Sequence, residues 1–139
     1  MLLTMSGKCL VVYYSKTGNT KKIAEAVVKR MGGDICEVNE KGAIMSSIDT
    51  SSYGLVVVGT PVNGFKASLP IQSYLRQNRA KLPSVAFFVT YGLFTAGTFG
   101  GLEKLTGKKP IATLAIKGKD VQQGKIEAKV DSFVAALKK

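Results

Sequence analysis

The sequence contains no histidine and no tryptophan, only two cysteines, and nine acidic residues against twenty lysines and arginines. Without histidine, Ser-His-Asp or Cys-His catalysis and histidine-liganded zinc sites are excluded. Cys9 and Cys36 are too few for a disulfide scaffold or a four-thiolate metal centre, and both lie in apolar stretches typical of reduced core cysteines. We therefore expect no metal site.

Long apolar segments are also missing. No stretch approaches the roughly 20 apolar residues that span a bilayer, and the apolar run 9–14 is too short for a secretory signal. These absences predict a cytoplasmic protein without a membrane span. The length of 139 residues and the hydrophobic content of 45% predict a single globular domain, residues 1–139.

The formal net charge of +11 indicates an anionic partner, such as nucleic acid, a membrane surface or an acidic protein. Much of this charge falls near the C-terminal ends of expected helices, where it complements helix dipoles: Lys29, Arg30, Arg76, Arg79, Lys81, Lys104, Lys108 and Lys109. A second group follows the expected strands: Lys16, Lys66, Lys117 and Lys119. Two interpretations stay open, namely solvated surface charge and a functional basic rim built on the second group.

Strand-like and helix-like segments alternate along the chain. Continuous apolar, β-branched runs predict strands buried on both faces at 8–14, 34–38, 55–58, 85–89 and 111–116. Helical periodicity predicts helices over 20–31, 69–80, 99–105 and from about 122, with room for a weak helical turn at 44–48. Thr20 is the expected N-cap of the first helix, and Leu69 is expected on an inward face. This alternation predicts an α/β fold with a doubly wound parallel sheet.

The loop after the first expected strand is rich in hydrogen-bonding groups. It reads Ser15-Lys16-Thr17-Gly18-Asn19-Thr20 and leads directly into a helix. Glycine permits a positive φ, and a helix N-terminus offers free N–H donors and partial positive charge. Neither a Walker A loop nor a G-x-G-x-x-G loop is present. The loop is either an ordinary strand-to-helix connection or a phosphate-binding nest, and its density of hydroxyl groups favours the nest.

The segment Y-Y-S-K-T-G-N-T-K-K-I-A resembles the FMN phosphate loop of flavodoxins, whose pattern is [ST]-x-T-G-x-T. The segment S-S-Y-G-L-V-V-V-G-T-P-V is similar to the third strand and following loop of short-chain flavodoxins, and T-Y-G-L-F-T-A-G falls where their second flavin-flanking loop belongs. The resemblance extends from Lys8 onward. It implies a flavodoxin-like sheet of five parallel strands in the order 2-1-3-4-5, with FMN as the cofactor.

The resemblance also implies a set of cofactor-binding residues. The FMN phosphate would bind to the first loop, at Ser15, Lys16, Thr17, Gly18, Asn19 and Thr20. One side of the isoalloxazine ring would be bordered by Thr60, Pro61, Val62, Asn63, Gly64 and Phe65. The other side would be bordered by Thr90, Tyr91, Gly92, Phe94 and Gly97. We identify no general base or nucleophile, because the flavin itself carries the redox chemistry.

Two features depart from the flavodoxin pattern. Asn63 stands where many flavodoxins place tryptophan, so one flavin face would be more exposed and binding weaker. The positive net charge is the reverse of the acidic surface typical of the family. Because positive charge stabilises an anionic reduced flavin, we expect a less negative second reduction potential. We also expect redox partners with an acidic docking surface.

Three functional hypotheses follow from these observations. The first is an FMN-bound electron carrier between redox proteins. The second is an FMN-dependent NAD(P)H:quinone or related reductase, although the short loops leave little cover for a second substrate. The third is a flavin-poor binding module that uses its basic surface, conceivably for nucleic acid. The placement of most charge at helix ends argues against nucleic acid.

Overall fold

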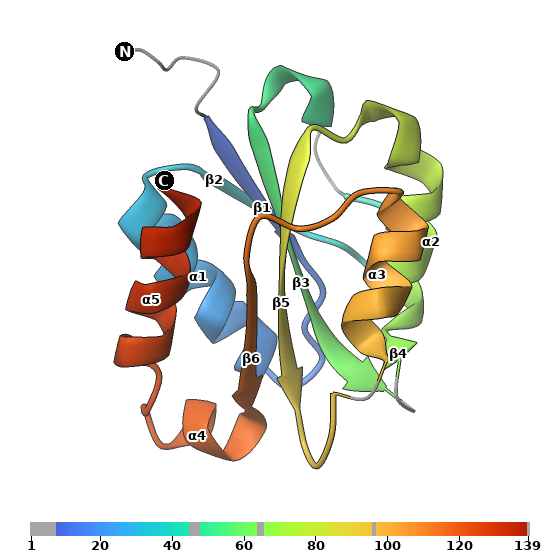
Figure 1. Ribbon diagram of the computed structural model, residues 1–139. Helices are drawn as coiled ribbons and strands as arrows, with labels where there is room; N and C mark the ends of the chain where they lie inside the picture. The colour runs from blue at the N-terminus through green and yellow to red at the C-terminus, as the bar shows by residue number, and fades with distance from the viewer. Residues whose placement is uncertain (1–7, 45–47, 64–65, 96, 139) are drawn as a thin grey trace.

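The strands of the protein form a central sheet that carries helices on both faces (Figure 1). The computed structural model describes residues 8–44, 48–63, 66–95 and 97–138. Within them, the parallel strands are β1 (Cys9–Tyr13), β2 (Asp34–Glu37), β3 (Leu55–Asn63), β5 (Ser84–Tyr91) and β6 (Thr113–Lys117). Their order is β2-β1-β3-β5-β6, which confirms the predicted doubly wound sheet and the order 2-1-3-4-5 of its parallel strands.

The helices divide between the two faces of the sheet. α1 (Asn19–Met31) and α5 (Glu127–Leu137) cover one face, and α2 (Leu69–Asn78) and α3 (Thr98–Thr106) cover the other (Figure 1). The short α4 (Gly118–Gln122) follows β6, and two 3₁₀ turns, η2 (Thr50–Ser52) and η3 (Arg79–Lys81), lie in connections. In the described part of the chain, none of the helices combines the length and apolar character needed to cross a bilayer.

The core has two parts because the strands are apolar on both faces. In β1, Cys9, Val11 and Tyr13 pack against the α1 and α5 side, whereas Leu10 and Val12 pack against the α2 and α3 side. Alternate residues of a strand point to opposite faces, so a continuous apolar run fills both layers. The prediction of strands buried on both faces is therefore confirmed for β1.

One row of the sheet on the α1 side combines two aromatic residues with a glycine. Tyr13 on β1, Gly59 on β3 and Phe88 on β5 are neighbours in the strand register. A Cβ atom added to Gly59 would lie 2.0 Å from Cζ of Phe88, so the ring occupies the space above the glycine. The row therefore packs as large, small, large across the sheet.

The end of β3 differs from the sequence prediction. The predicted strand stopped at Val58, but β3 continues to Asn63. Residues 59–61 continue the parallel pairing with β5, and β4 (Lys66–Ala67) folds back and pairs antiparallel with Val62 and Asn63. This pairing supplies main-chain hydrogen bonds to a segment that lacks a hydrophobic pattern.

Two helix predictions need correction. The helix predicted from about Gln122 begins only at Glu127, as α5, and residues 123–126, where Gly124 adopts a φ of +74°, separate it from α4, which lies before the predicted start. Leu69 is 75% exposed instead of facing inward. It lies two residues before Ile71, and residues at that spacing lie on opposite sides of a helix. The core stripe of α2 is formed by Ile71, Tyr74 and Leu75.

The segment around 44–48 was predicted to hold a weak helical turn. Residues 45–47 lie outside the described residues. Ile44 forms an antiparallel bridge with Val38, close to the end of β2.

Tyr74 buries a hydroxyl group without a hydrogen-bond partner among the described residues. Burial raises the pKa of this hydroxyl because the charged form is excluded from water. We expect Tyr74→Phe to raise the free energy of unfolding by about 1 kcal/mol, since it removes a desolvated polar group. The matched change Tyr53→Phe should lower it by about 1 kcal/mol, because Tyr53 donates a 2.7 Å hydrogen bond to Asp34. Urea denaturation tests both, and a loss of stability in Tyr74→Phe would contradict the prediction.

Candidate functional site

The loop between β1 and α1 is closed by its own serine. The Ser15 hydroxyl oxygen accepts hydrogen bonds from the N–H groups of Gly18, at 3.1 Å, and Lys21, at 3.2 Å. Gly18 adopts a φ of +97°, a conformation that favours glycine, and it is the residue before the first turn of α1. The loop therefore curls over the N-terminus of α1, and the O–H hydrogen of Ser15 stays available as a donor.

Thr20 does not cap α1, so that prediction was wrong. The helix begins at Asn19, with Gly18 as its N-cap and no side-chain cap bond. Thr20 is buried inside the first turn, and its hydroxyl lies 2.8 Å from the Thr90 hydroxyl at the end of β5. The left-handed conformation of Gly18 starts the helix early enough to turn Thr20 inward. The pair of hydroxyls thus ties the loop to the centre of the sheet.

Two further tyrosine contacts hold the end of β1. The Tyr14 hydroxyl donates a 2.7 Å hydrogen bond to Glu40, and this bond raises the pKa of Tyr14. The Tyr13 hydroxyl lies 3.4 Å from Glu37, and burial together with that carboxylate raises the pKa of Tyr13 to about 12. Both hydroxyls are therefore neutral donors at neutral pH. They connect the strand that precedes the loop to β2 and the turn after it.

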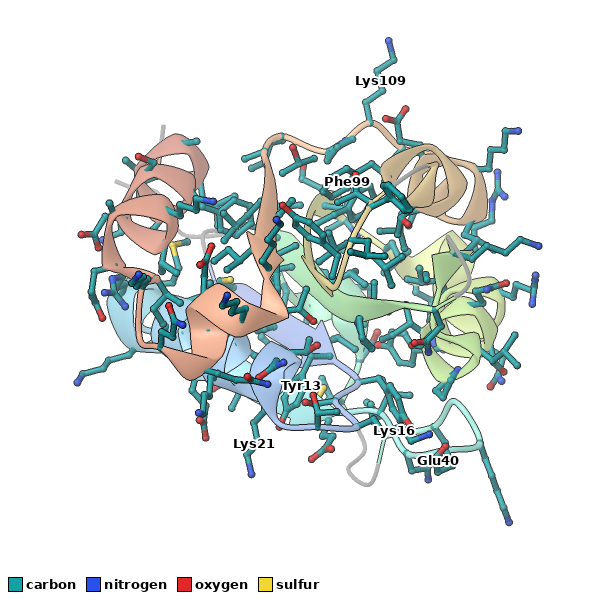
Figure 2. All side chains as sticks on the ribbon, turned by 90° about the horizontal axis from the view of Figure 1, so that it is seen from below. Tyr13, Lys16, Lys21, Glu40, Phe99 and Lys109 are labelled. Atoms are coloured by element: carbon teal, nitrogen blue, oxygen red, sulfur yellow. The ribbon has the colours of Figure 1, made fainter. Side chains whose placement is uncertain are left out.

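A groove of about 340 Å³ lies over the carboxyl ends of the strands. Figure 2 views the molecule from this end. The groove is lined by residues from four segments that are distant in sequence: Thr17, Asn19, Pro61, Val62, Thr90, Tyr91, Gly92, Gly118, Lys119 and Gln122. Ligands of open α/β sheets bind at such a switch point, where the strand order reverses.

The structure brings seven of the predicted site residues together in this groove: Thr17, Asn19, Pro61, Val62, Thr90, Tyr91 and Gly92. Thr60 is fully buried, and its hydroxyl lies 3.0 Å from the Ser68 hydroxyl and accepts the Ser68 N–H at 2.9 Å. That side chain ties β3 to the start of α2 and does not reach the groove surface. Gly64 and Phe65 lie outside the described residues.

The remaining predicted residues border neighbouring surfaces. Lys16 and Asn63 line a hollow of about 550 Å³ that also contains Tyr14 and Glu40, and Figure 2 labels Lys16 and Glu40 at this end of the molecule. Phe94, in the loop after β5, is 59% exposed. Gly97 lines a separate groove between α2 and α3.

The segment after β6 adds two groove residues that the sequence analysis missed, Gly118 and Gln122. A Cβ atom on Gly118 would lie 2.8 Å from Nδ2 of Asn19, so this glycine lets α4 approach the first loop closely. The position of Gly118, two residues after the predicted strand 111–116, was the available signal. Lys119 was expected on this side, and it lines the groove.

The Thr20–Thr90 hydroxyl pair permits a double-mutant test. Thr20→Val leaves the Thr90 hydroxyl buried without this partner, so we expect it to lower the free energy of unfolding by about 1–2 kcal/mol. Thr20→Val/Thr90→Val removes both polar groups and should restore much of that loss. Urea denaturation of the single and double variants measures the coupling. If the loss of unfolding free energy in the double variant equals the sum of the losses in the two single variants, the pairing of the hydroxyls is contradicted.

Comparison with known proteins is consistent with this geometry. A family model described as flavodoxin domain matches residues 10–139. The fold is similar to that of a flavoprotein in complex with FMN from Lactobacillus acidophilus NCFM, with a TM-score of 0.69 and 23% identity over 84% of this chain and 97% of that one. It is also similar to two-electron reduced Megasphaera elsdenii flavodoxin, with a TM-score of 0.66 and 24% identity over 92% and 98% of the two chains.

A third similar structure is a flavodoxin from the domain Archaea, with a TM-score of 0.64 and 21% identity over 95% of this chain and 99% of that one. No significant match was found among curated protein sequences. The solved structures agree with the fold, and the family model spans nearly all of the chain, including the loop after β1. This protein therefore belongs to the flavodoxin domain family.

Proposed function

We propose that the protein binds FMN and carries electrons between redox proteins of the cytoplasm. The observation that carries this proposal is the continuity of the loop after β1 with the groove over the strand ends. Thr17 and Asn19 belong to the loop and also line the groove. FMN has the matching form, with a phosphate at one end and a flat ring system at the other.

The residues at the phosphate end fit a phosphate group. Donors are provided by the Ser15 hydroxyl, by the side chains of Thr17 and Asn19, and by the backbone N–H groups of Asn19 and Thr20, which have no partner inside the helix. Gly18 has no atom within 4 Å of the position where a Cβ would stand, so it leaves the loop backbone open to an anion. The donor set is mostly neutral, and the helix dipole supplies part of the positive potential.

The residues at the ring end fit a flat aromatic ligand. Pro61 and Val62 form one wall of the groove, and Tyr91 and Gly92 form another. Bound FMN supplies the electron-accepting chemistry, and the chain binds, orients and shields it. Asn63 is exposed and offers no aromatic cover, so one face of the ring would be open to solvent. We therefore infer weaker binding than an aromatic residue at Asn63 would give.

The lysine in the groove bears on the reduction potential. Lys119 is exposed at the groove wall, and its positive charge would stabilise the negative charge that flavin gains on reduction. We expect Lys119→Gln to make the second one-electron potential more negative by about 20–50 mV, since 59 mV corresponds to about 1.4 kcal/mol. Lys29→Gln, in the last turn of α1, removes the same charge far from the groove and serves as the control. If a redox titration shows equal shifts of the second potential in Lys119→Gln and Lys29→Gln, a local effect of Lys119 is contradicted.

The carrier hypothesis is tested with the FMN-loaded protein. Its visible spectrum is recorded, it is photoreduced stepwise, and its transfer of electrons to an acidic iron–sulfur protein is timed. We expect one-electron steps, slow oxidation of added NADPH, and transfer rates that fall with salt. Rapid NADPH oxidation by the isolated protein would instead support the reductase hypothesis. A colourless protein without FMN affinity would overturn the proposal and support a binding module.

A further inference from the structure

A hollow outside the proposed flavin site lies between α2 and α3. We name it the α2–α3 groove, and it has a volume of about 610 Å³. Its cationic rim is formed by Lys66, Arg76 and Lys104, and its other walls include Leu105 and the helical glycines Gly100 and Gly101. It is on the sheet face opposite α1 and α5, as the positions of α2 and α3 in Figure 1 show.

The charge of this groove is uncompensated. No acidic residue lines it, and among the described residues none of its three cations forms an ion pair. Arg30 on α1 shows the contrast, because it pairs with both Glu127 and Asp131. The guanidinium of Arg76 is held by the Gln72 side-chain oxygen at 3.3 Å. The groove therefore presents positive charge in a partly fixed arrangement.

The rim charge extends beyond the groove along α3. A neighbouring hollow is lined by Lys104, Lys108 and Lys109, with Glu103 as its acidic residue. Lys109 projects from this side of the molecule in Figure 2. An occupant that follows α3 would thus meet Lys104, Lys108 and Lys109, with Glu103 among them.

The glycines of α3 have no role in packing within the described chain. A Cβ atom on Gly100 or Gly101 would meet no atom within 4 Å, although alanine stabilises a helix interior relative to glycine. These positions leave bare helix backbone open at the groove wall. Such a surface lets the backbone of another chain approach closely, in the way that small residues at helix–helix contacts let two helices approach.

We propose that the α2–α3 groove docks an acidic amphipathic segment of a protein partner. Apolar side chains of that segment would enter the groove beside Leu105 and the glycines, and its carboxylates would pair with Lys66, Arg76 and Lys104. Among the residues that the structure describes, no aromatic side chain lines the groove, whereas single-stranded nucleic acids are bound by stacking on aromatic residues. Apolar walls with a cationic rim suit an acidic amphipathic peptide better than a nucleic acid.

The groove is adjacent to the proposed flavin site. Gly97, at the end of the loop that follows β5, lines it, and Lys66 lines both this groove and the hollow that contains Asn63. The inference deepens the proposed function, since it locates the partner of the flavin protein. Binding at the groove does not itself require flavin, so the two proposals can fail separately.

The test uses the full chain, loaded with FMN and again without it. A fluorescein-labelled peptide of leucine and glutamate in an amphipathic helical pattern is the probe, and fluorescence anisotropy measures its affinity. A second peptide replaces leucine with serine, a third replaces glutamate with lysine, and a duplex oligonucleotide is the fourth ligand. The variant Arg76→Gln/Lys104→Gln is compared with Lys29→Gln/Lys125→Gln, which removes equal charge from exposed positions on the other side.

We expect the leucine–glutamate peptide to bind, and Arg76→Gln/Lys104→Gln to weaken it by about ten-fold or more while the control pair changes it less than about two-fold. Gly100→Leu, which fills the groove and leaves the net charge unchanged, should weaken it similarly. Equal losses in the two charge variants, or equal affinity of the serine peptide, would overturn the proposal because they indicate diffuse attraction. Tighter binding of the oligonucleotide at the same residues would also overturn it. Peptide binding without FMN affinity would refute the proposed function alone.

Discussion

Thr17→Asp is expected to weaken FMN binding by at least about 100-fold, because it places a carboxylate beside the position that we propose for the phosphate. Thr17 is exposed in the loop after β1 and lines the groove. Two like charges about 4 Å apart repel by roughly 4 kcal/mol at the effective dielectric constant of a protein surface. The doubly charged phosphate makes the repulsion larger.

The matched control is Thr17→Asn, which has nearly the shape of aspartate but no charge. We expect it to weaken binding by about ten-fold or less, since the amide still donates a hydrogen bond. Quenching of FMN fluorescence measures both affinities, and thermal denaturation without FMN shows whether the fold is intact. Similar affinities for the two variants would show that the phosphate binds elsewhere.

Gly59→Ala is expected to lower the free energy of unfolding by about 3 kcal/mol. The added methyl group would stand 2.0 Å from Cζ of Phe88, within a row of Tyr13, Gly59 and Phe88 that is closed on both sides. Both aromatic residues are buried, so neither ring can turn toward solvent. The sheet would have to shift or Phe88 would have to leave its preferred rotamer.

A second substitution separates this clash from other effects of alanine. Phe88→Leu makes room above position 59. The loss of unfolding free energy in Gly59→Ala/Phe88→Leu should therefore be smaller than the sum of the losses in the two single variants. Gly100→Ala is the control for the residue change, because its site is open and helical, and it should raise stability by about 0.5–1 kcal/mol. Urea denaturation measures all four variants. Additive losses would show that the clash is relieved without moving Phe88.

The strands and the loop after β1 could be predicted because they depend on local patterns. Val56, Val57 and Val58 are apolar in succession, and a short β-branched run of this kind is typical of a strand covered on both faces. The loop is recognisable because hydroxyls, an amide and a glycine follow one strand directly. In both cases the residues that carry the signal are neighbours in the sequence.

The features that could not be predicted depend on contacts between distant residues. The pairing of Thr20 with Thr90 is set by the position of α1 over the sheet, so Thr20 looked like a cap when read alone. β4 has two residues, too few for any hydrophobic period. The backbone at Gly118 lies close to the Asn19 side chain only because β6 lies beside β5 and α4 turns back over the strand ends.

The two hydrogen bonds accepted by Ser15 have a thermodynamic consequence. They close the loop in the free protein, so the conformational entropy of ordering it is lost during folding and not during association. A preorganised loop retains more of the contact energy as affinity. Free FMN then stabilises the native state increasingly as its concentration rises above the dissociation constant. The gain is about 2.7 kcal/mol when the concentration is a hundred times that constant. The abundance of the folded protein in a cell would thereby follow its supply of flavin.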